Sequence, residues 1–418
     1  MLEPLAHIGR DPATGGYLRD AWSDADMELR EWFAGEAARR GLDLREDRNG
    51  NLWAWWGDPS RRPGVVTGSH LDSVRQGGAF DGPLGVVSAF AALDIMKNRE
   101  IVPDRPLGVV CFTDEEGARF GVPCMGSRLL TGVLSPDRAL GLTDDDGATL
   151  AEVMTRAGRR PHDVGRDDET LATVGTFVEL HVEQGKGLVD HDRPVGVAAS
   201  IWPHGRWRFD FSGRADHAGT TRLADRDDPM LPFARVVLAA REAAERRGVV
   251  ATVGKVRVSP GNANAIPGLV SAWLDVRGAD ERAVRALVAE LARTSGGGDP
   301  GVAELATSGG GGPDTAELAR SSGGGPSVRE ESWTPTVEFD AALRDRLAKV
   351  IGGDTPAPVL PTGAGHDAGI LAAAGVPSAM LFVRNPTGVS HSPDEHAERA
   401  DCEAGVVALA DVLEDLCR

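Results

Sequence analysis

The stretch that decides the fold is GVVCFTDEEGARFG, residues Gly108–Gly121, in which an apolar run ends in three consecutive acids. A short, near-continuous apolar run is typical of a strand that is buried on both faces of a parallel sheet. Asp114, Glu115 and Glu116 follow this run, and adjacent carboxylates repel one another. The stretch therefore predicts a buried strand whose end carries something that offsets the negative charge.

Segments around this strand alternate between strand and helix patterns. Residues 51–57 and 64–70 are apolar runs that favour strands. Residues 24–40 and 85–98 carry apolar side chains at helical spacing. Strands of this kind, separated by helices, predict an α/β domain with a mostly parallel sheet and helices on both faces. In such sheets ligands bind at the carboxyl ends of the strands, where the polar clusters of this sequence fall.

A second pattern begins at about residue 201. Residues 205–213, GRWRFDFSG, alternate between apolar and polar side chains, which is typical of a half-exposed strand. The order strand, helix, two strands, helix, strand then predicts a small sheet with helices on one face. We expect residues 201–334 to form an inserted α+β domain, and residues 1–200 and 335–418 to form the main domain.

Part of the inserted domain, residues 294–327, is rich in glycine. The segment at 295–307 is nearly repeated at 308–320. A sequence of this composition cannot bury enough apolar surface to order itself. We therefore expect a flexible inserted loop in this part of the chain.

The composition of the chain indicates which classes of molecule it can bind. The chain has 418 residues, 41% of them hydrophobic, and a formal net charge of −18. So acidic a surface argues against nucleic acid or an anionic membrane, although a local arginine or metal can still attract a small anion. No apolar run approaches the roughly 18 residues of a membrane span, and no signal-peptide pattern is present. Because the four cysteines form no CxxC pair, we expect a reduced, cytoplasmic protein.

Histidines and carboxylates gather at the predicted strand ends. Taken singly, a histidine beside an apolar strand is most often a hydrogen-bonded core residue, and an aspartate before a glycine is a common turn signal. Taken together, three histidines and at least three carboxylates form the ligand set of two divalent cations, which would also offset the repulsion between adjacent acids. The residues are His70, Asp72, Asp81, Glu115, Glu116, His181 and His391.

The motifs that carry these residues occur in a recognisable order. The sequence resembles the M20 family of binuclear metallohydrolases, and within it the amidase branch of allantoate amidohydrolases, N-carbamoyl-L-amino acid hydrolases and β-ureidopropionases. The resemblance extends from about residue 68 to residue 396. Its motifs are GSHLDSV, GGAFDGPLGV, DEEGARFG, ELHVEQG, DHAGTT, NAIPG, LDVR, GAGHDAG and SHSPDE.

This resemblance implies two divalent cations per subunit, manganese or zinc. His70 and His181 would bind one cation. Glu116 and His391 would bind the other, and Asp81 would bridge the two. The cations would lower the pKa of the water held between them and polarise the scissile carbonyl.

The other polar residues of the cluster would have supporting roles. Asp72 would hydrogen-bond a ligand imidazole and fix its tautomer. Glu115 would take a proton from the attacking water and give one to the leaving nitrogen. Because successive strand residues point to opposite faces, Glu115 and Glu116 should have different environments if strand geometry persists. We expect Asp114 to hold the turn through a backbone N–H.

The inserted domain would act as a lid and carry the interface of a homodimer. His217 would reach the active site of the partner subunit and hydrogen-bond the oxyanion. Asn264 and Arg277 would grip the substrate carboxylate, which a planar guanidinium binds bidentately. The alternative for Arg277 is a surface ion pair with Asp275 or Asp280.

Several other hydrogen-bond donors of the sequence would help to determine which substrate binds. Gln184 would hydrogen-bond a ureido group, and His366 would line the site. His204, Arg222 and Arg226 add donors near the lid, with plain surface positions as the alternative. Extra donors suit a small anion with two ureido groups and a carboxylate, which is allantoate.

The function implied by the resemblance is hydrolysis of a ureido C–N bond. We expect conversion of allantoate to ureidoglycine or ureidoglycolate, with release of ammonia and carbon dioxide. An N-carbamoyl-L-amino acid hydrolase or a β-ureidopropionase is the alternative within the branch. A binding protein that kept the fold without the chemistry is the alternative outside it, and the intact set of expected ligands argues against that alternative.

Overall fold

The chain consists of two compact units. The structure, a computed structural model, describes residues 1–294 and 325–418. The first unit comprises Met1–Ile201 and Val337–Arg418, and the second comprises Trp202–Thr336. These boundaries lie close to the expected ones at residues 200 and 334. Most of the glycine-rich segment at 294–327 lies outside the described residues.

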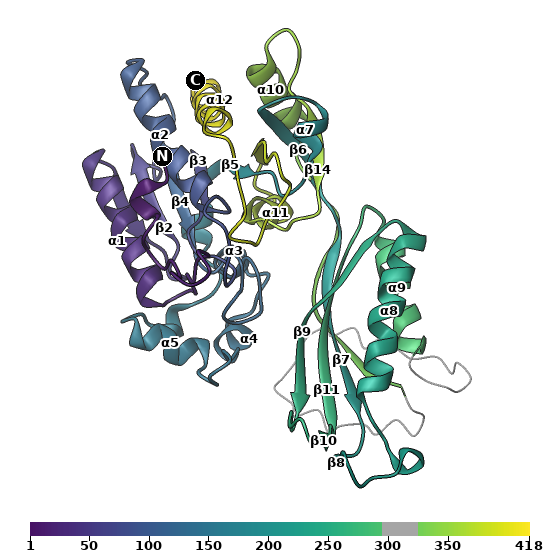
Figure 1. Cartoon of the computed structure of the whole chain (residues 1–418). Helices are drawn as coiled ribbons and strands as arrows, with labels where there is room; N and C mark the ends of the chain where they lie inside the picture. Colours follow the sequence, from purple (N-terminus) through teal and green to yellow (C-terminus); the bar gives the residue numbers. More distant parts are fainter. Residues whose placement is uncertain (295–324) are drawn as a thin grey trace. The chain divides into compact units, whose positions relative to one another are not determined.

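A nine-stranded sheet forms the centre of the first unit (Figure 1). Its order is β1-β2-β4-β3-β5-β15-β6-β13, and β14 pairs with β6. The four central strands, β4, β3, β5 and β15, are parallel, whereas the pairs towards both edges are mostly antiparallel. The strands are β1 (Asp43–Glu46), β2 (Leu52–Trp56), β3 (Gly64–His70), β4 (Leu107–Phe112), β5 (Val174–Val182), β6 (Val195–Ile201), β13 (Val337–Glu338), β14 (Val359–Thr362) and β15 (Ser378–Val383).

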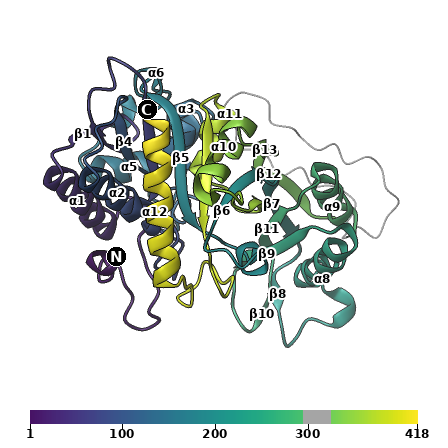
Figure 2. The same cartoon turned by 90° about the horizontal axis from the view of Figure 1, so that it is seen from above.

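Helices cover both faces of this sheet, so the predicted α/β class is confirmed, with a mixed sheet that is parallel only at its centre. One face packs against α1 (Asp24–Arg39), α2 (Pro83–Asn98), α10 (Ala341–Gly352) and α12 (Arg399–Leu416). In Figure 2, α12 runs lengthwise over this unit. The other face packs against α3 (Met125–Thr131) and α11 (Asp367–Ala373). The remaining α-helices of this unit are α4 (Pro136–Leu140), α5 (Leu150–Arg156), α6 (Asp168–Leu171) and α7 (Gly187–Asp190).

Two separate cores explain why the central strands are apolar at nearly every position. Val65 and Val109 belong to the core under α1, α2 and α12. Their neighbours Val66 and Val110 belong to the core under α3 and α11. Because side chains alternate between the faces of a strand, a sheet covered on both faces needs apolar residues in succession.

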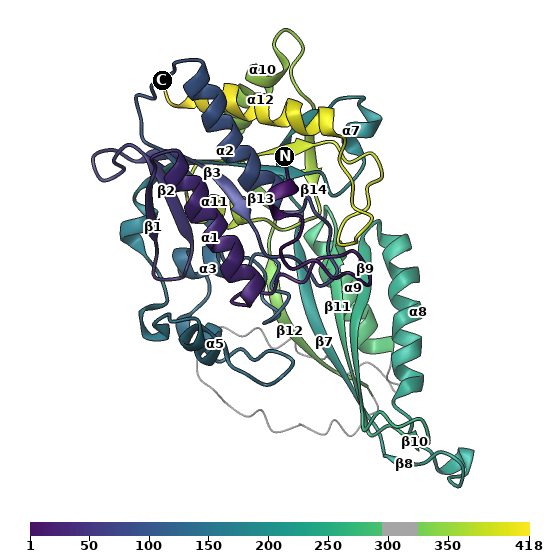
Figure 3. The same cartoon turned by 60° about the vertical axis from the view of Figure 1, so that its left-hand side comes forward.

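A four-stranded antiparallel sheet forms the second unit, in the order β12-β7-β11-β9. Alternate residues of β7, Trp207, Phe209 and Phe211, are buried in the core beneath two helices, while the residues between them are partly exposed. A short pair of strands, β8 and β10, extends from one end of this sheet (Figure 3). The elements are β7 (His204–Ser212), β8 (Asp216–His217), α8 (Met230–Arg247), β9 (Val250–Ser259), β10 (Ala265–Ile266), β11 (Leu269–Arg277), α9 (Glu281–Thr294) and β12 (Ser327–Thr334).

Within residues 1–294 and 325–418, no helix combines the length and the apolar character that crossing a membrane requires.

Candidate metal centre

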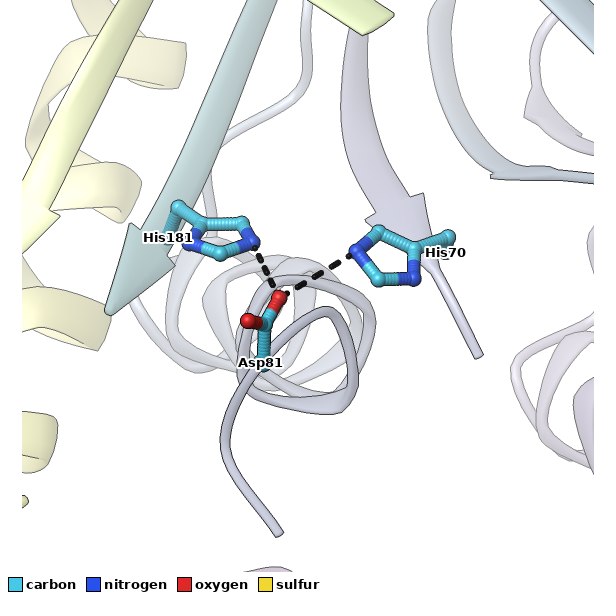
Figure 4. A group of neighbouring side chains, drawn as sticks. All are labelled: His70, Asp81 and His181. Atoms are coloured by element: carbon cyan, nitrogen blue, oxygen red, sulfur yellow. Dashed lines mark ion pairs between the residues drawn. The ribbon is translucent and has the colours of Figure 1, made fainter. Parts of the chain in front are cut away.

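Two histidines and one aspartate meet at the carboxyl ends of the central strands (Figure 4). His70 ends β3, His181 is the penultimate residue of β5, and Asp81 lies just before α2. The distance from Asp81 Oδ1 to His181 Nε2 is 3.1 Å, and to His70 Nε2 it is 3.6 Å. All three side chains are buried. The adjacency of β3 and β5 in the sheet thus brings together ligands that are far apart in the sequence.

The loop that carries Asp81 passes directly against the imidazole of His70. Gly82 adopts φ +83°, and a Cβ at this position would lie 2.4 Å from a ring atom of His70. Pro83 then begins α2, where a missing N–H costs nothing. The glycine is therefore required by both the backbone conformation and the close approach.

The hydrogen bonds of the two imidazoles orient their free nitrogens towards Asp81. His70 Nδ1 lies 3.1 Å from the carbonyl oxygen of Asp72, and His181 Nδ1 lies 2.9 Å from that of Val182. A nitrogen bonded to a carbonyl must be the donor, so the neutral form of each imidazole carries its lone pair on Nε2. Among the residues described, neither Nε2 has a hydrogen-bond partner of good geometry. Two lone pairs and a carboxylate oxygen facing one point fit a cation.

A second group of ligands lies on the other side of Asp81. His391 Nε2 is 3.5 Å from Asp81 Oδ2 and 3.5 Å from Glu116 Oε2. The buried Glu116 Oε1 has no hydrogen-bond partner within residues 1–294 and 325–418. The two oxygens of Asp81 therefore face different ligand groups, as the resemblance implied for a bridging carboxylate. The chemistry of both donor sets fits a divalent cation.

A third possible group, Glu179, His181 and His366, is less suited to a cation. The oxygens of Glu179 already accept hydrogen bonds from Ser69 Oγ at 2.7 Å and from the backbone N–H of Ala368 at 3.1 Å. His366 is buried, and its ring centroid lies 4.5 Å from that of His181. His366 therefore packs beside a ligand residue.

Asp114, Glu115 and Glu116 lie in a turn and not at the end of a strand. The expectation that Glu115 and Glu116 differ because they point to opposite faces of a strand is therefore corrected. Strand β4 stops at Phe112, and Asp114 adopts φ +53°. Glu115 and Glu116 differ in environment because the chain bends here, since strand geometry has already ended. Neither oxygen of Asp114 has a hydrogen-bond partner in the described parts of the chain, so the expected bond to a backbone N–H was wrong.

Asp72 holds this turn instead. Its carboxylate accepts hydrogen bonds from the backbone N–H groups of Glu115 at 3.1 Å and Glu116 at 3.0 Å. The same carboxylate lies 3.5 Å from His70 Nδ1. Asp72 therefore fixes three residues of the cluster, two of them through the backbone.

The two glutamates have different surroundings. Glu115 Oε2 lies 3.7 Å from His70 Nε2, and the Cys124 thiol donates to Glu115 Oε1 at 3.3 Å. Burial raises the pKa of Glu115 well above its ordinary value, and nearby carboxylates add to the rise. Burial, with the carboxylate of Asp81, raises the pKa of Glu116 to about 7. The pKa of Glu116 therefore lies near neutral pH, and the pKa of Glu115 lies above its ordinary range.

The expected substrate residues of the second unit lie at opposite ends of its sheet. His217 pairs with Ala265 across β8 and β10, and the N–H of Ala218 donates to the carbonyl of Asn264 at 3.0 Å. His204 and Arg277 pair at the far end of β7 and β11. The nine residues of β11 span about 27 Å. One chain therefore does not bring Asn264 and Arg277 together.

Arg277 has the partner that the alternative interpretation named. Its Nε donates to Asp275 Oδ1 at 2.7 Å, and its Nη2 donates to Oδ2 at 3.1 Å. A substrate carboxylate would have to compete with Asp275 for this guanidinium. His204 is buried, with Nδ1 at 2.9 Å from the carbonyl oxygen of Trp202.

Several contacts of the cluster were not anticipated. Gln184 Nε2 donates to Asp81 Oδ2 at 2.8 Å and to Ser390 Oγ at 3.2 Å, so this amide touches the bridging carboxylate. Glu395 accepts from the backbone N–H of Asp81 at 3.0 Å. Ser390 and Glu395 both stand in the SHSPDE motif, and the motif was the available signal for them.

Comparison with known proteins identifies the family. The model of Peptidase family M20/M25/M40 matches residues 66–415. The chain belongs to this family. It is 35% identical to an N-carbamoyl-L-amino acid amidohydrolase of Geobacillus stearothermophilus, over 98% of this chain and 95% of that protein. It is 31% identical to the allantoate amidohydrolase of Escherichia coli strain K12, over 99% and 95% of the two chains.

The solved structures agree with this placement. An amidase of the hydantoinase/carbamoylase family from Burkholderia vietnamiensis has a TM-score of 0.85 and 28% identity, over 99% of this chain and 95% of that chain. The expected membership of the M20 amidase branch is thus confirmed, and the chain is an amidohydrolase-type hydrolase of this branch.

We predict that this M20 protein releases protons when it binds a divalent cation. Burial lowers the pKa of His70, but the carboxylates of Glu115, Asp72 and Asp81 raise it by more, to well above its ordinary value. The pKa of His181 is likewise raised by Asp81 against the effect of burial. Raised pKa values leave protons on the metal-free cluster at pH 7, and ligands must lose them to bind a cation.

Calorimetric titration of the metal-free protein in buffers of different ionisation enthalpy measures this release. We expect about one or more protons per protein at pH 7, and fewer as the pH rises above the raised pKa values. Heats that do not depend on the buffer would contradict the assigned protonation of the cluster.

Proposed function

We propose that the protein hydrolyses a ureido C–N bond of a small carboxylate, with two divalent cations at the cluster around Asp81. The observation that carries the proposal is that Asp81 presents one oxygen to His70 and His181 and the other to His391. Manganese and zinc are the cations we propose from the family resemblance. Bound there, the cations supply a water of lowered pKa and polarise the scissile carbonyl.

The residues of the chain would carry out proton transfer and hold the reacting groups in position. Glu115 lies beside the first ligand group, and its carboxyl group has a pKa well above the ordinary value because it is buried. A base of raised pKa both accepts a proton readily and holds it for the leaving nitrogen. Asp72 keeps Glu115 in place through the backbone N–H of that residue. We therefore propose Glu115 as the proton carrier and Glu116 as a ligand.

This division predicts opposite results for two similar substitutions. Glu115→Gln should leave the metal content near that of the wild type and lower turnover by about 10²- to 10⁴-fold, because the proton carrier is lost. Glu116→Gln should lower the metal content as well. Elemental analysis and ammonia release measure the two properties. Metal loss in Glu115→Gln with full metal in Glu116→Gln would reverse the assignment.

Allantoate is the first substrate we propose, although two of the donors expected to favour it have other partners. Arg222 pairs with Asp225. Arg226 donates to the backbone carbonyls of Thr221 at 3.1 Å and Ala218 at 2.6 Å, and so holds the turn after His217. The support that remains is the similarity to allantoate amidohydrolases of Escherichia coli and Bacillus subtilis, each 31% identical to this chain.

An N-carbamoyl-L-amino acid is the second candidate, because the Geobacillus stearothermophilus relative that acts on this class is 35% identical to the chain. We predict ammonia release from allantoate at a higher kcat/KM than from N-carbamoyl-L-methionine. The assay uses metal-loaded protein with both substrates, and Glu115→Gln as the blank. Turnover of the carbamoyl amino acid alone would replace allantoate as the substrate, and turnover of neither would overturn the proposed reaction.

We further propose that the protein is a homodimer formed by the second unit. Strand β9 is an edge strand with exposed Val250, Val256 and Val258. Helix α8 packs beside it and exposes Leu231 at 58% and Leu238 at 67%. An apolar edge strand is a template for pairing with a second copy. Because His217 and Arg277 lie at opposite ends of this sheet, a dimer is also the simplest way to bring both to one site.

Mixing two inactive variants tests the shared site. His217→Ala and Arg277→Ala should each lose most activity alone. If His217 acts in the partner's site and Arg277 in its own, a mixed dimer contains one intact site of two. Random exchange of subunits should then restore about a quarter of the wild-type activity. Size-exclusion chromatography verifies the dimer and serves as the control for both variants. Activity that stays at the level of the separate variants would contradict the shared site.

A further inference from the structure

A buried glutamate that the proposed chemistry does not use, Glu395, lies four residues after the ligand His391. Its side chain is 5% exposed. Its Oε2 accepts hydrogen bonds from the backbone N–H groups of Phe80 at 2.9 Å and Asp81 at 3.0 Å. Glu395 therefore ties the loop of His391 to the loop that carries the bridging carboxylate.

The second oxygen of Glu395 extends this link to the side chain of Asp81. Ser390 Oγ lies 3.2 Å from Glu395 Oε1 and 3.2 Å from Asp81 Oδ2. The hydroxyl of Ser390 thus stands between the two carboxylates, directly beside His391 in the sequence. Two backbone N–H groups donate to the carboxylate of Glu395, and the single O–H of Ser390 can donate to Glu395 Oε1 or to Asp81 Oδ2. It is absent from every possible ligand group of the described residues.

The approach of Glu395 to the Asp81 loop leaves no room for a side chain at Gly78. A Cβ on Gly78 would lie 2.3 Å from Glu395 Oε2 and 2.4 Å from Glu395 Cβ. The backbone there is not in the left-handed region, so space alone requires this glycine. Glu395 of the SHSPDE motif thus packs directly against Gly78, Phe80 and Asp81 of the GGAFDG motif.

We propose that Glu395 is a positioning residue that sets the distance between the two cation positions by coupling the His391 loop to Asp81. Asp72 provides the precedent in the same site, because it too accepts two successive backbone N–H groups, those of Glu115 and Glu116. Each ligand-bearing loop is then held by a carboxylate that is not itself a ligand. The proposal rests on the proposed binuclear function and adds a residue that governs cation affinity.

Measuring cation affinity distinguishes a positioning role of Glu395 from a role in stabilising the fold alone. Glu395→Ala removes both backbone hydrogen bonds and the contact with Ser390, and should weaken divalent cation binding by about 10- to 100-fold, the usual effect of removing a group that orients ligands. Glu395→Gln keeps an oxygen for the two N–H groups and should retain affinity within a few-fold. Glu398→Ala is the matched control, because Glu398 is exposed and, within residues 1–294 and 325–418, its side chain pairs with His396 alone.

The experiment uses the full-length protein, stripped of metal and titrated with Mn²⁺ or Zn²⁺ in equilibrium dialysis. A Co²⁺ titration followed by visible absorption reports the coordination of the bound ion. The melting temperature is measured with and without cation. We expect the rise in melting temperature on adding cation to shrink in Glu395→Ala and to persist in the other two variants.

A double-mutant cycle with Gly78 tests the contact directly. Gly78→Ala should displace Glu395 and weaken cation binding in the wild-type background. In a Glu395→Gly background the same change should have little effect on cation binding, because the carboxylate and the Cβ that the new methyl group would meet are both absent. The effects of contacting residues are non-additive in this way, whereas independent effects add.

Three results are decisive. A wild-type protein that binds no divalent cation overturns the proposed function itself. A wild type that binds two cations, with Glu395→Ala binding them equally well, overturns the role of Glu395 and leaves the function intact. Equal losses of affinity in Glu395→Ala and Glu398→Ala would mean that the segment merely supports the fold, which also overturns it.

Discussion

The carboxylate of Asp81 is the group on which the rest of the site depends. Its Oδ1 faces the imidazoles of His70 and His181, and its Oδ2 faces His391. Lone pairs and negative charge converge on it from both sides, and such an arrangement is stable only with protons or cations between the groups. The parallel centre of the sheet, the glycine at position 82 and the burial of the cluster all serve to keep this one carboxylate in place.

Two further carboxylates hold the surrounding loops, and they do so through the backbone. Asp72 accepts the N–H groups of Glu115 and Glu116, and Glu395 accepts those of Phe80 and Asp81. A backbone N–H has little freedom, so anchoring it fixes the Cα positions and leaves only the side-chain torsions to adjust. Such preorganisation lets the ligand atoms take their places without much loss of conformational entropy when a cation arrives.

The sequence predicts the strands and the clustering of the candidate ligands because both leave patterns. The apolar runs ending at His70 and Phe112 reflect a sheet covered on both faces, and the histidines and acids stand directly after such runs. The turn at Asp114 has only a weak signal, since aspartate adopts a positive φ such as +53° more often than most residues, but still uncommonly. The partners of Glu395 could not be predicted either, because a side chain that bonds a distant backbone produces no periodicity. The pairing of Arg277 with Asp275, two residues away, was only one of the alternatives that the sequence offered.

The order of the ligands along the chain has a consequence for how the site is made. His70, Asp81 and His181 all precede Trp202, where the second unit begins, whereas His391 follows that unit. During synthesis from the N-terminus, the proposed donors of the first cation position are therefore made well before His391 completes those of the second. Under the proposed binuclear function, the second position would depend on the return of the C-terminal segment to the sheet.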